Sequence, residues 1–142
     1  MIIWGRILGW VIVSGYLLTV ANYLVKLINR KFISGLPKNS TWRHRYQAFM
    51  RMVVKMHPFL GILTAAALVT HFIIQFLTWG FFVTGLIAGS LMLIQAVLGS
   101  YGRFIRKRKP GLWLKAHRTV AVLLLLAITF HVYTGLSMLR GS

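Results

Sequence analysis

The amino-acid sequence predicts an all-α integral membrane protein, a bundle of four transmembrane helices with both termini outside. Three observations support this. The 142 residues are 58% hydrophobic, which is too apolar for a soluble domain. Four apolar runs are each long enough to cross a hydrocarbon core, which needs ~20 helical residues. The 17 Lys and Arg residues gather between these runs, as is typical of cytoplasmic loops.

The helices are expected at about 2–28, 41–78, 81–105 and 112–139, and together they form a single membrane domain covering 1–142. The first apolar run lacks a basic leader and a small-residue cleavage site, so we expect a retained helix rather than a signal peptide. A turn at 36–40 precedes the second helix, with Ser40 as a candidate N-cap.

The basic residues fall into two regions, 26–55 and 103–118, and only Arg6 and Arg140 lie elsewhere. Cytoplasmic loops are enriched in Lys and Arg, so both regions should face the cytoplasm, and both termini should face outward. The second and fourth helices then run in the same direction. A multi-pass protein of the prokaryotic plasma membrane is expected, with membrane lipid rather than nucleic acid as the partner of the basic residues.

The composition excludes many functions. The chain has no Asp, Glu or Cys, so it offers no carboxylate for acid–base work and no thiolate for metal binding or covalent haem attachment. Five histidines remain as good metal ligands. His44 lies among arginines before the second apolar run and is expected at the surface. The other four lie within apolar runs.

These four histidines form two pairs with the same spacing. His57 and His71 are fourteen residues apart on the second helix, and His117 and His131 are fourteen apart on the fourth. Fourteen steps of ~100° return to within ~40° of the starting direction and advance ~21 Å, so each pair shares a helix face. Because the two helices are expected to be parallel, His57 should lie level with His117 at an inner height, and His71 level with His131 at an outer height.

A porphyrin iron takes one nitrogen ligand on each side of its plane, so the two opposed pairs predict two stacked, non-covalent b-type haems that would carry electrons across the bilayer. Alternatives remain: structural histidines that bond across helices, a proton pathway or a route for transition metals. A proton relay would normally recruit carboxylates, which are absent.

Two glycines and four cations extend the predicted haem sites. Gly85 and Gly99 are also fourteen apart, and a missing side chain would let a flat macrocycle approach the third helix, although helix packing through Gly85 and Gly89 is an alternative. Four cations are candidate partners for acidic haem propionates, and anchoring of lipid headgroups is the alternative role for each. The candidate propionate partners at the inner site are Arg51, Lys55, Lys115 and Arg118.

The segment Lys55-Met56-His57-Pro58-Phe59-Leu60-Gly61, together with His71, His117-Arg118 and His131, resembles the core of di-haem four-helix b-type cytochromes. These include transmembrane cytochrome b electron carriers and the membrane domains of ferric reductases. The resemblance covers about residues 50–135 and implies bis-histidine haem b. The chain has no recognisable nucleotide-binding domain or quinol-oxidation motif, so the resemblance also implies a redox partner protein or a larger complex.

The sequence therefore predicts the cytochrome b subunit of a membrane oxidoreductase linked to the quinone pool, rather than a stand-alone enzyme. Menaquinone or ubiquinone is a candidate ligand, with Tyr16, Gln75, Trp79 and Tyr133 as candidate lining residues near the outer surface. Two alternatives remain. One is a cofactor-free anchor or assembly subunit that docks acidic proteins or anionic lipid through its basic surface, and the other is a small transporter or channel.

Overall fold

The computed structural model describes residues 2–107, 109 and 111–140, and within them the chain is helical and holds no strand. The expected all-α fold is confirmed. Four helices are long and apolar enough to cross a membrane. In chain order the elements are α1 (Ile2–Ile28), the π-helical segment η1 (Asn29–Ile33), α2 (Thr41–Trp79), α3 (Val83–Ser100), the π-helical segment η2 (Tyr101–Ile105) and α4 (Leu112–Arg140).

The helix boundaries have local causes. Ser40 occupies the N-cap position of α2 in an extended conformation, but its hydroxyl makes no capping bond. The cap is a backbone interaction, in which the His44 N–H donates to the Ser40 carbonyl oxygen at 3.2 Å. Gly80 ends α2 with a φ of 77°, which glycine adopts without steric cost. The third helix begins at Val83, two residues later than expected, because Phe82 is still extended.

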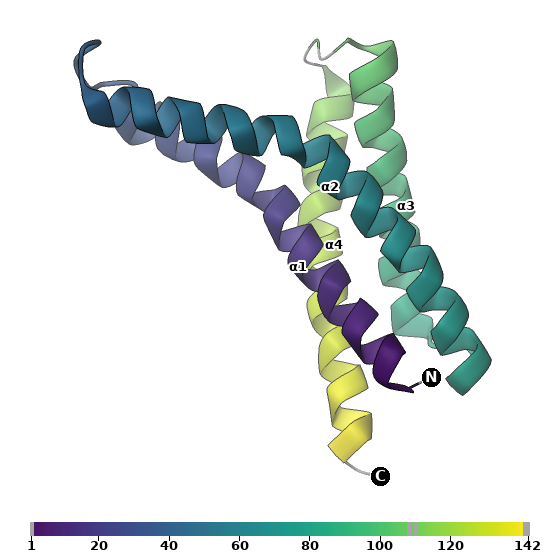
Figure 1. The fold of residues 1–142 in the computed structure, drawn as a ribbon. Coiled ribbons are helices and arrows are strands. Elements are labelled where there is room, and N and C mark those ends of the chain that lie inside the picture. The colour runs from purple at the N-terminus through teal and green to yellow at the C-terminus, as the bar shows by residue number, and fades with distance from the viewer. Residues whose placement is uncertain (1, 108, 110, 141–142) are drawn as a thin grey trace.

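The helices form two antiparallel hairpins, α1 with α2 and α3 with α4 (Figure 1). Both termini and the α2–α3 turn lie at one end of the bundle, and the η1–α2 and η2–α4 connections lie at the other (Figure 1). We call these the terminal end and the loop end. α2 and α4 therefore run in the same direction, which is the arrangement that the histidine pairing requires.

α2 bends near its middle, and the hairpin of α1 and α2 leans away from α3 and α4 at the loop end (Figure 1). Pro58 lies inside α2 and has no N–H to donate to the carbonyl four residues earlier, which bends a helix. The start of α2 is tied to its neighbours. The Tyr46 hydroxyl donates to the Val25 carbonyl oxygen at 3.0 Å, and Arg43 donates to that of Leu36 at 2.7 Å.

A small core joins the two hairpins. It is centred on Leu124, which is fully buried. The Tyr16 hydroxyl donates to the carbonyl oxygen of Ala121 and so links α1 to α4. The core side chains come from α1, α3 and α4: Ile12, Tyr16, Ala88, Met92, Leu124 and Ile128.

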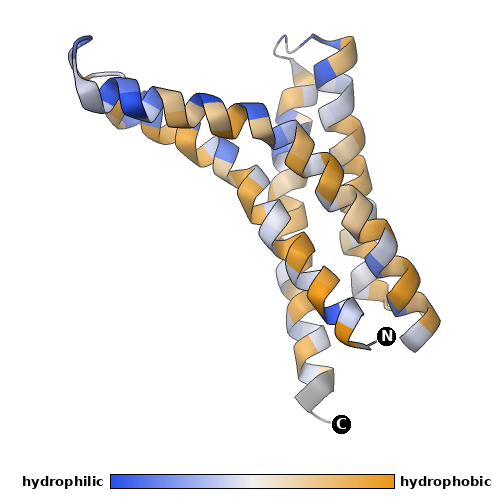
Figure 2. Ribbon diagram, in the orientation of Figure 1, coloured by the Kyte–Doolittle hydropathy of each residue, from blue (hydrophilic) through white to orange (hydrophobic). Residues whose placement is uncertain are grey.

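Most large apolar side chains face outward. Ile62, Val97 and Leu126, on three different helices, are 70%, 67% and 63% exposed. Figure 2 shows the hydrophobic colour over most of the four helices, whereas hydrophilic residues gather at the start of α2 and the connection before it. A continuous apolar exterior of this kind is characteristic of a surface that meets lipid or another protein.

α1 packs closely on α2 at Gly15, where a larger side chain should destabilise the protein. A Cβ on Gly15 would collide with the Thr64 hydroxyl and lie 3.4 Å from its Cβ. Thr64 is buried and its hydroxyl bonds the Leu60 carbonyl oxygen, so it has little room to move. Overpacking costs about 1–3 kcal/mol, and Gly15→Ala should lower the thermal unfolding temperature in detergent.

Gly61→Ala is the matched control, because nothing lies within 4 Å of a Cβ built on Gly61. Alanine favours a helix over glycine by about 1 kcal/mol, so this variant should unfold at or above the temperature of the unmodified protein. Equal unfolding temperatures for the two variants would contradict the packing described here.

Candidate functional site

The structure brings His57 and His117 together between the hairpins. Their ring centroids lie 6.4 Å apart and the ring planes cross at 84°. The two residues come from α2 and α4, and each is half-buried. The level pairing expected from the sequence is therefore present for the pair nearer the loop end, which we call the inner pair.

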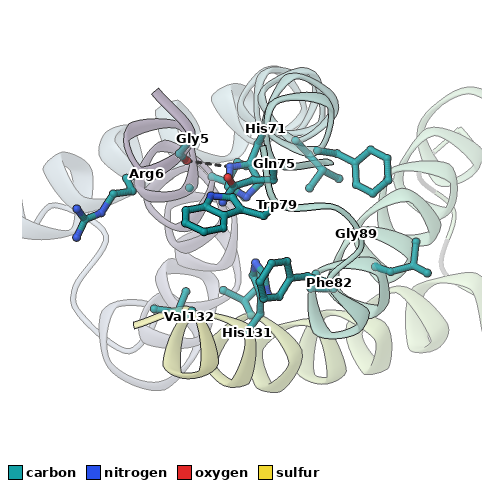
Figure 3. Close-up of a pocket in the computed structure, with 18 of the residues that line it drawn as sticks. Gly5, Arg6, His71, Gln75, Trp79, Phe82, Gly89, His131 and Val132 are labelled. Carbon is teal, nitrogen blue, oxygen red and sulfur yellow. Dashed lines mark hydrogen bonds between the residues drawn. The ribbon is translucent and has the colours of Figure 1, made fainter. Parts of the chain in front are cut away.

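His71 and His131 line a cavity of about 310 Å³ near the terminal end, and they stand on opposite walls of it (Figure 3). We call them the outer pair. All four helices contribute to the lining, which is mostly apolar and includes Trp10, Leu68, Phe76, Phe82, Met92 and Ile128. Six glycines also line it, namely Gly5, Gly9, Gly80, Gly85, Gly89 and Gly135, so backbone forms much of the wall.

Backbone carbonyls of α1 orient both histidines of α2. The Nδ1 of His57 lies 3.1 Å from the Thr19 carbonyl oxygen, and the Nδ1 of His71 lies 3.0 Å from that of Gly5. Thr19 and Gly5 are themselves fourteen residues apart. A carbonyl oxygen only accepts, so each Nδ1 carries the proton and each Nε2 keeps its lone pair for a ligand.

Side chains of α3 contact both histidines of α4. The Thr84 hydroxyl lies 3.0 Å from the Nδ1 of His131. The amide nitrogen of Gln95 lies 3.3 Å from the Nε2 of His117. Within the described part of the chain, the His117 Nδ1 and the Gln95 Oε1 are buried without a hydrogen-bond partner. The two histidines of α4 therefore differ in which ring nitrogen is hydrogen-bonded: Nδ1 in His131 and Nε2 in His117.

The glycines of α3 make room for the histidines themselves. A Cβ on Gly85 would lie 3.0 Å from the Cε1 of His131, and one on Gly99 would lie 3.4 Å from the Cε1 of His117. Gly9 of α1 relates to His71 in the same way, at 3.4 Å. We expected Gly85 and Gly99 to let a macrocycle approach α3. In the structure each lies against the imidazole at its own height.

The four cations predicted at the inner site are all exposed. The Arg118 guanidinium lies 5.6 Å from the centre of the Tyr23 ring, so it extends toward α1. Near the outer pair, Arg6 lines the cavity, but Figure 3 shows its guanidinium directed away from His71. The side chain of Arg140 lies outside the described residues.

The residues suggested for a quinone divide into two groups. Gln75 and Trp79 line the outer cavity (Figure 3). Tyr16 is 4% exposed in the core, and Tyr133 is 69% exposed, and neither lines that cavity. All four were expected near the outer surface, as the lining of a quinone pocket, with interfacial anchoring as the alternative for the three aromatic residues. Tyr16 instead lies deep in the bundle, where its hydroxyl has the Ala121 carbonyl as a partner.

Sequence reasoning missed five contact residues, which are Gly5, Gly9, Thr19, Thr84 and Gln95. Gly5 and Thr19 have the same spacing as the histidines, but they accept through backbone carbonyl oxygens, which every residue type has. Among residues 2–107, 109 and 111–140, no three metal-binding side chains converge. His57 and His117 contact each other, and His71 and His131 face each other across the outer cavity.

Comparisons of the chain with models of known protein families, with curated proteins and with solved structures found no match. The resemblance to di-haem b-type cytochromes therefore rests on the four histidines, their spacing and the contacts described above.

Proposed function

We propose that this chain is a membrane electron-transfer protein that holds two non-covalent haem b groups, each between one histidine of α2 and one of α4. The observation that carries the proposal is the pairing of His57 with His117 and of His71 with His131 at two heights. His57 and His71 also have a carbonyl acceptor at Nδ1, and the Nδ1 of His131 has a hydroxyl oxygen as its partner. Metal-binding histidines commonly have such a partner, which leaves Nε2 for the metal.

The spacing of the inner pair fits axial ligation. Metal–imidazole bonds of about 2.0–2.1 Å, with roughly 1 Å more from each nitrogen to its ring centre, place two axial imidazole centroids about 6 Å apart. The 6.4 Å between His57 and His117 agrees with that separation. The nearly perpendicular rings are compatible with two independent ligands on opposite sides of one plane.

The outer pair fits for a different reason. Ligand sites are mainly apolar cavities with a few polar groups that converge on the ligand. The cavity between His71 and His131 has this character, and its glycines remove the side chains that would otherwise fill it. Gln75 in its wall is the candidate hydrogen-bond partner for an acidic substituent of a haem.

A bound haem supplies one-electron chemistry, as its iron alternates between ferric and ferrous states. This chain would bind and orient the cofactors and would set their potentials through the histidines that hold them. With both heights occupied, the protein would connect donors and acceptors on the two sides of a membrane. We infer a subunit that works with a redox partner protein and the quinone pool, with Gln75 and Trp79 as the contacts available to a quinone.

We further propose that the four helices span the prokaryotic plasma membrane with the loop end in the cytoplasm and both termini outside. The basic regions 26–55 and 103–118 lie at the loop end, where the positive-inside rule places such residues. The outward-facing apolar side chains would then contact lipid.

Because the chain has no cysteine, its topology can be tested with single introduced thiols. Ser34→Cys lies in the exposed connection at the loop end, and Phe81→Cys replaces a side chain that is 70% exposed in the α2–α3 turn. In intact cells a membrane-impermeant thiol reagent should label Phe81→Cys and spare Ser34→Cys until the membrane is opened. The reverse pattern would overturn the orientation.

The haem proposal is tested by purification and spectroscopy. The purified protein should show a reversible Soret and α-band shift on reduction, typical of low-spin bis-histidine iron, and pyridine haemochrome analysis should find two haems per chain. A colourless protein from haem-replete cells, or one that binds haem without a low-spin spectrum, would overturn the proposal.

Substitution of single ligands should separate the two sites. His71→Ala or His131→Ala should each lower the haem content from two to one, because the protein's affinity for a haem falls when one of the two histidines that would hold it is removed. His57→Ala and His117→Ala should remove the other haem and leave the outer one. His44→Ala is the matched control, because His44 is exposed at the start of α2, and it should retain both haems. Loss of neither haem from the outer-pair variants would contradict the ligand assignment.

One observation favours the alternative of a cofactor-free anchor or docking subunit. The loop end carries exposed aromatic residues beside its cations, with Trp42 76% and Phe32 68% exposed. Such a surface could bind acidic proteins or anionic lipid. This alternative predicts a colourless protein, so the absorption spectrum distinguishes the two functions.

A further inference from the structure

The side chain of His131 is linked to its own backbone carbonyl through two threonine hydroxyls. Its Nδ1 lies 3.0 Å from the Thr84 hydroxyl. That hydroxyl lies 3.4 Å from the hydroxyl of Thr134, which in turn donates to the His131 carbonyl oxygen at 2.9 Å. The path therefore begins at the side chain of His131 and ends on its own backbone, passing through α3 on the way.

The donors and acceptors along this path can be assigned one by one. A threonine hydroxyl has one proton to give and two lone pairs. Thr134 gives its proton to the backbone carbonyl, so it accepts from Thr84. When the Thr84 hydroxyl donates to Thr134, it accepts from the Nδ1–H of His131. This order places the imidazole proton on Nδ1 and leaves Nε2 free.

We propose that Thr84 is a positioning residue for His131, which fixes the tautomer and ring orientation of an outer axial ligand and raises its basicity. The inference rests on the proposed haem function and adds a tuning device to it. A hydrogen bond at the second ring nitrogen makes an imidazole a stronger donor, and a stronger donor favours the ferric over the ferrous state.

Thr84 provides a contact of this type that can be changed without altering the backbone. His57 and His71 bond to carbonyl oxygens of α1, which no side-chain substitution removes. The acceptor of His131 is a hydroxyl, and valine has nearly the same shape without it. Thr84 is half-buried, so its replacement does not expose a new apolar surface to water.

The test compares Thr84→Val with Thr84→Ser in the full-length, haem-loaded protein. Valine should weaken the donor strength of His131 and so lower the protein's preference for ferric over ferrous haem at the outer site about tenfold. For a one-electron couple this raises the midpoint potential of the outer haem by about 59 mV. The outer component is recognised by its absence from His71→Ala protein. Serine retains the hydroxyl and should restore the original potential. Thr134→Val should give a smaller shift, because the 3.4 Å link is long for an O–H···O bond.

Thr129→Val is the matched control on α4, since the hydroxyl of Thr129 is exposed and bonds only to the Leu125 carbonyl oxygen in its own helix. The electron paramagnetic resonance signal of the ferric outer haem, which responds to ligand ring orientation, should move in Thr84→Val and stay fixed in Thr129→Val.

If Thr84→Val keeps the wild-type potential and signal while both haems are bound, the positioning role is wrong and the proposed function stands. Equal shifts at both haems would also overturn the role, and a colourless wild-type protein would overturn the function and this inference together.

Discussion

Fourteen residues make nearly four α-helical turns, and the candidate site depends on that relation. Histidines at this spacing share one face of a helix, so a helix can present two imidazoles at two heights without twisting. The arrangement also needs α2 and α4 to run in the same direction. The turn around Gly80 reverses the chain from α2 into α3, and a second reversal between η2 and α4 brings the fourth helix back to the direction of the second.

The helices without histidines complete the site. α1 offers carbonyl oxygens at Gly5 and Thr19, and α3 offers a hydroxyl and an amide at Thr84 and Gln95. Glycine matters here for space, because a Cβ at position 85 would press on the imidazole of His131. Each hairpin thus contains one helix that presents the histidines and another that orients and accommodates them. If the proposed function holds, four helices would bind two cofactors with few specialised residues.

The sequence predicted most helix ends within two residues, since long apolar runs bounded by Pro, Gly and cations are strong signals. The exception is the third helix, which was expected to end at 105: α3 ends at Ser100, and the chain continues as the π-helical segment η2 to Ile105. It also predicted which histidines share a height, because helical spacing and charge distribution together determine this. It did not predict how the imidazoles are supported. Every residue carries a carbonyl, so residue type does not reveal which one will accept a bond. The depth of Tyr16 was missed for a related reason, as a tyrosine in the core looks like an interfacial one until its hydroxyl finds a backbone partner.

In the proposed function each iron would be held by one imidazole from α2 and one from α4. Pulsed electron paramagnetic resonance of the oxidised protein, produced with isotope-labelled histidine, tests this ligation. We expect two low-spin ferric centres per chain, each with two directly coordinated histidine nitrogens, and the loss of one centre in His71→Ala protein. A preparation in which either centre couples to fewer than two histidine nitrogens, or in which no ferric centre is present, would contradict it.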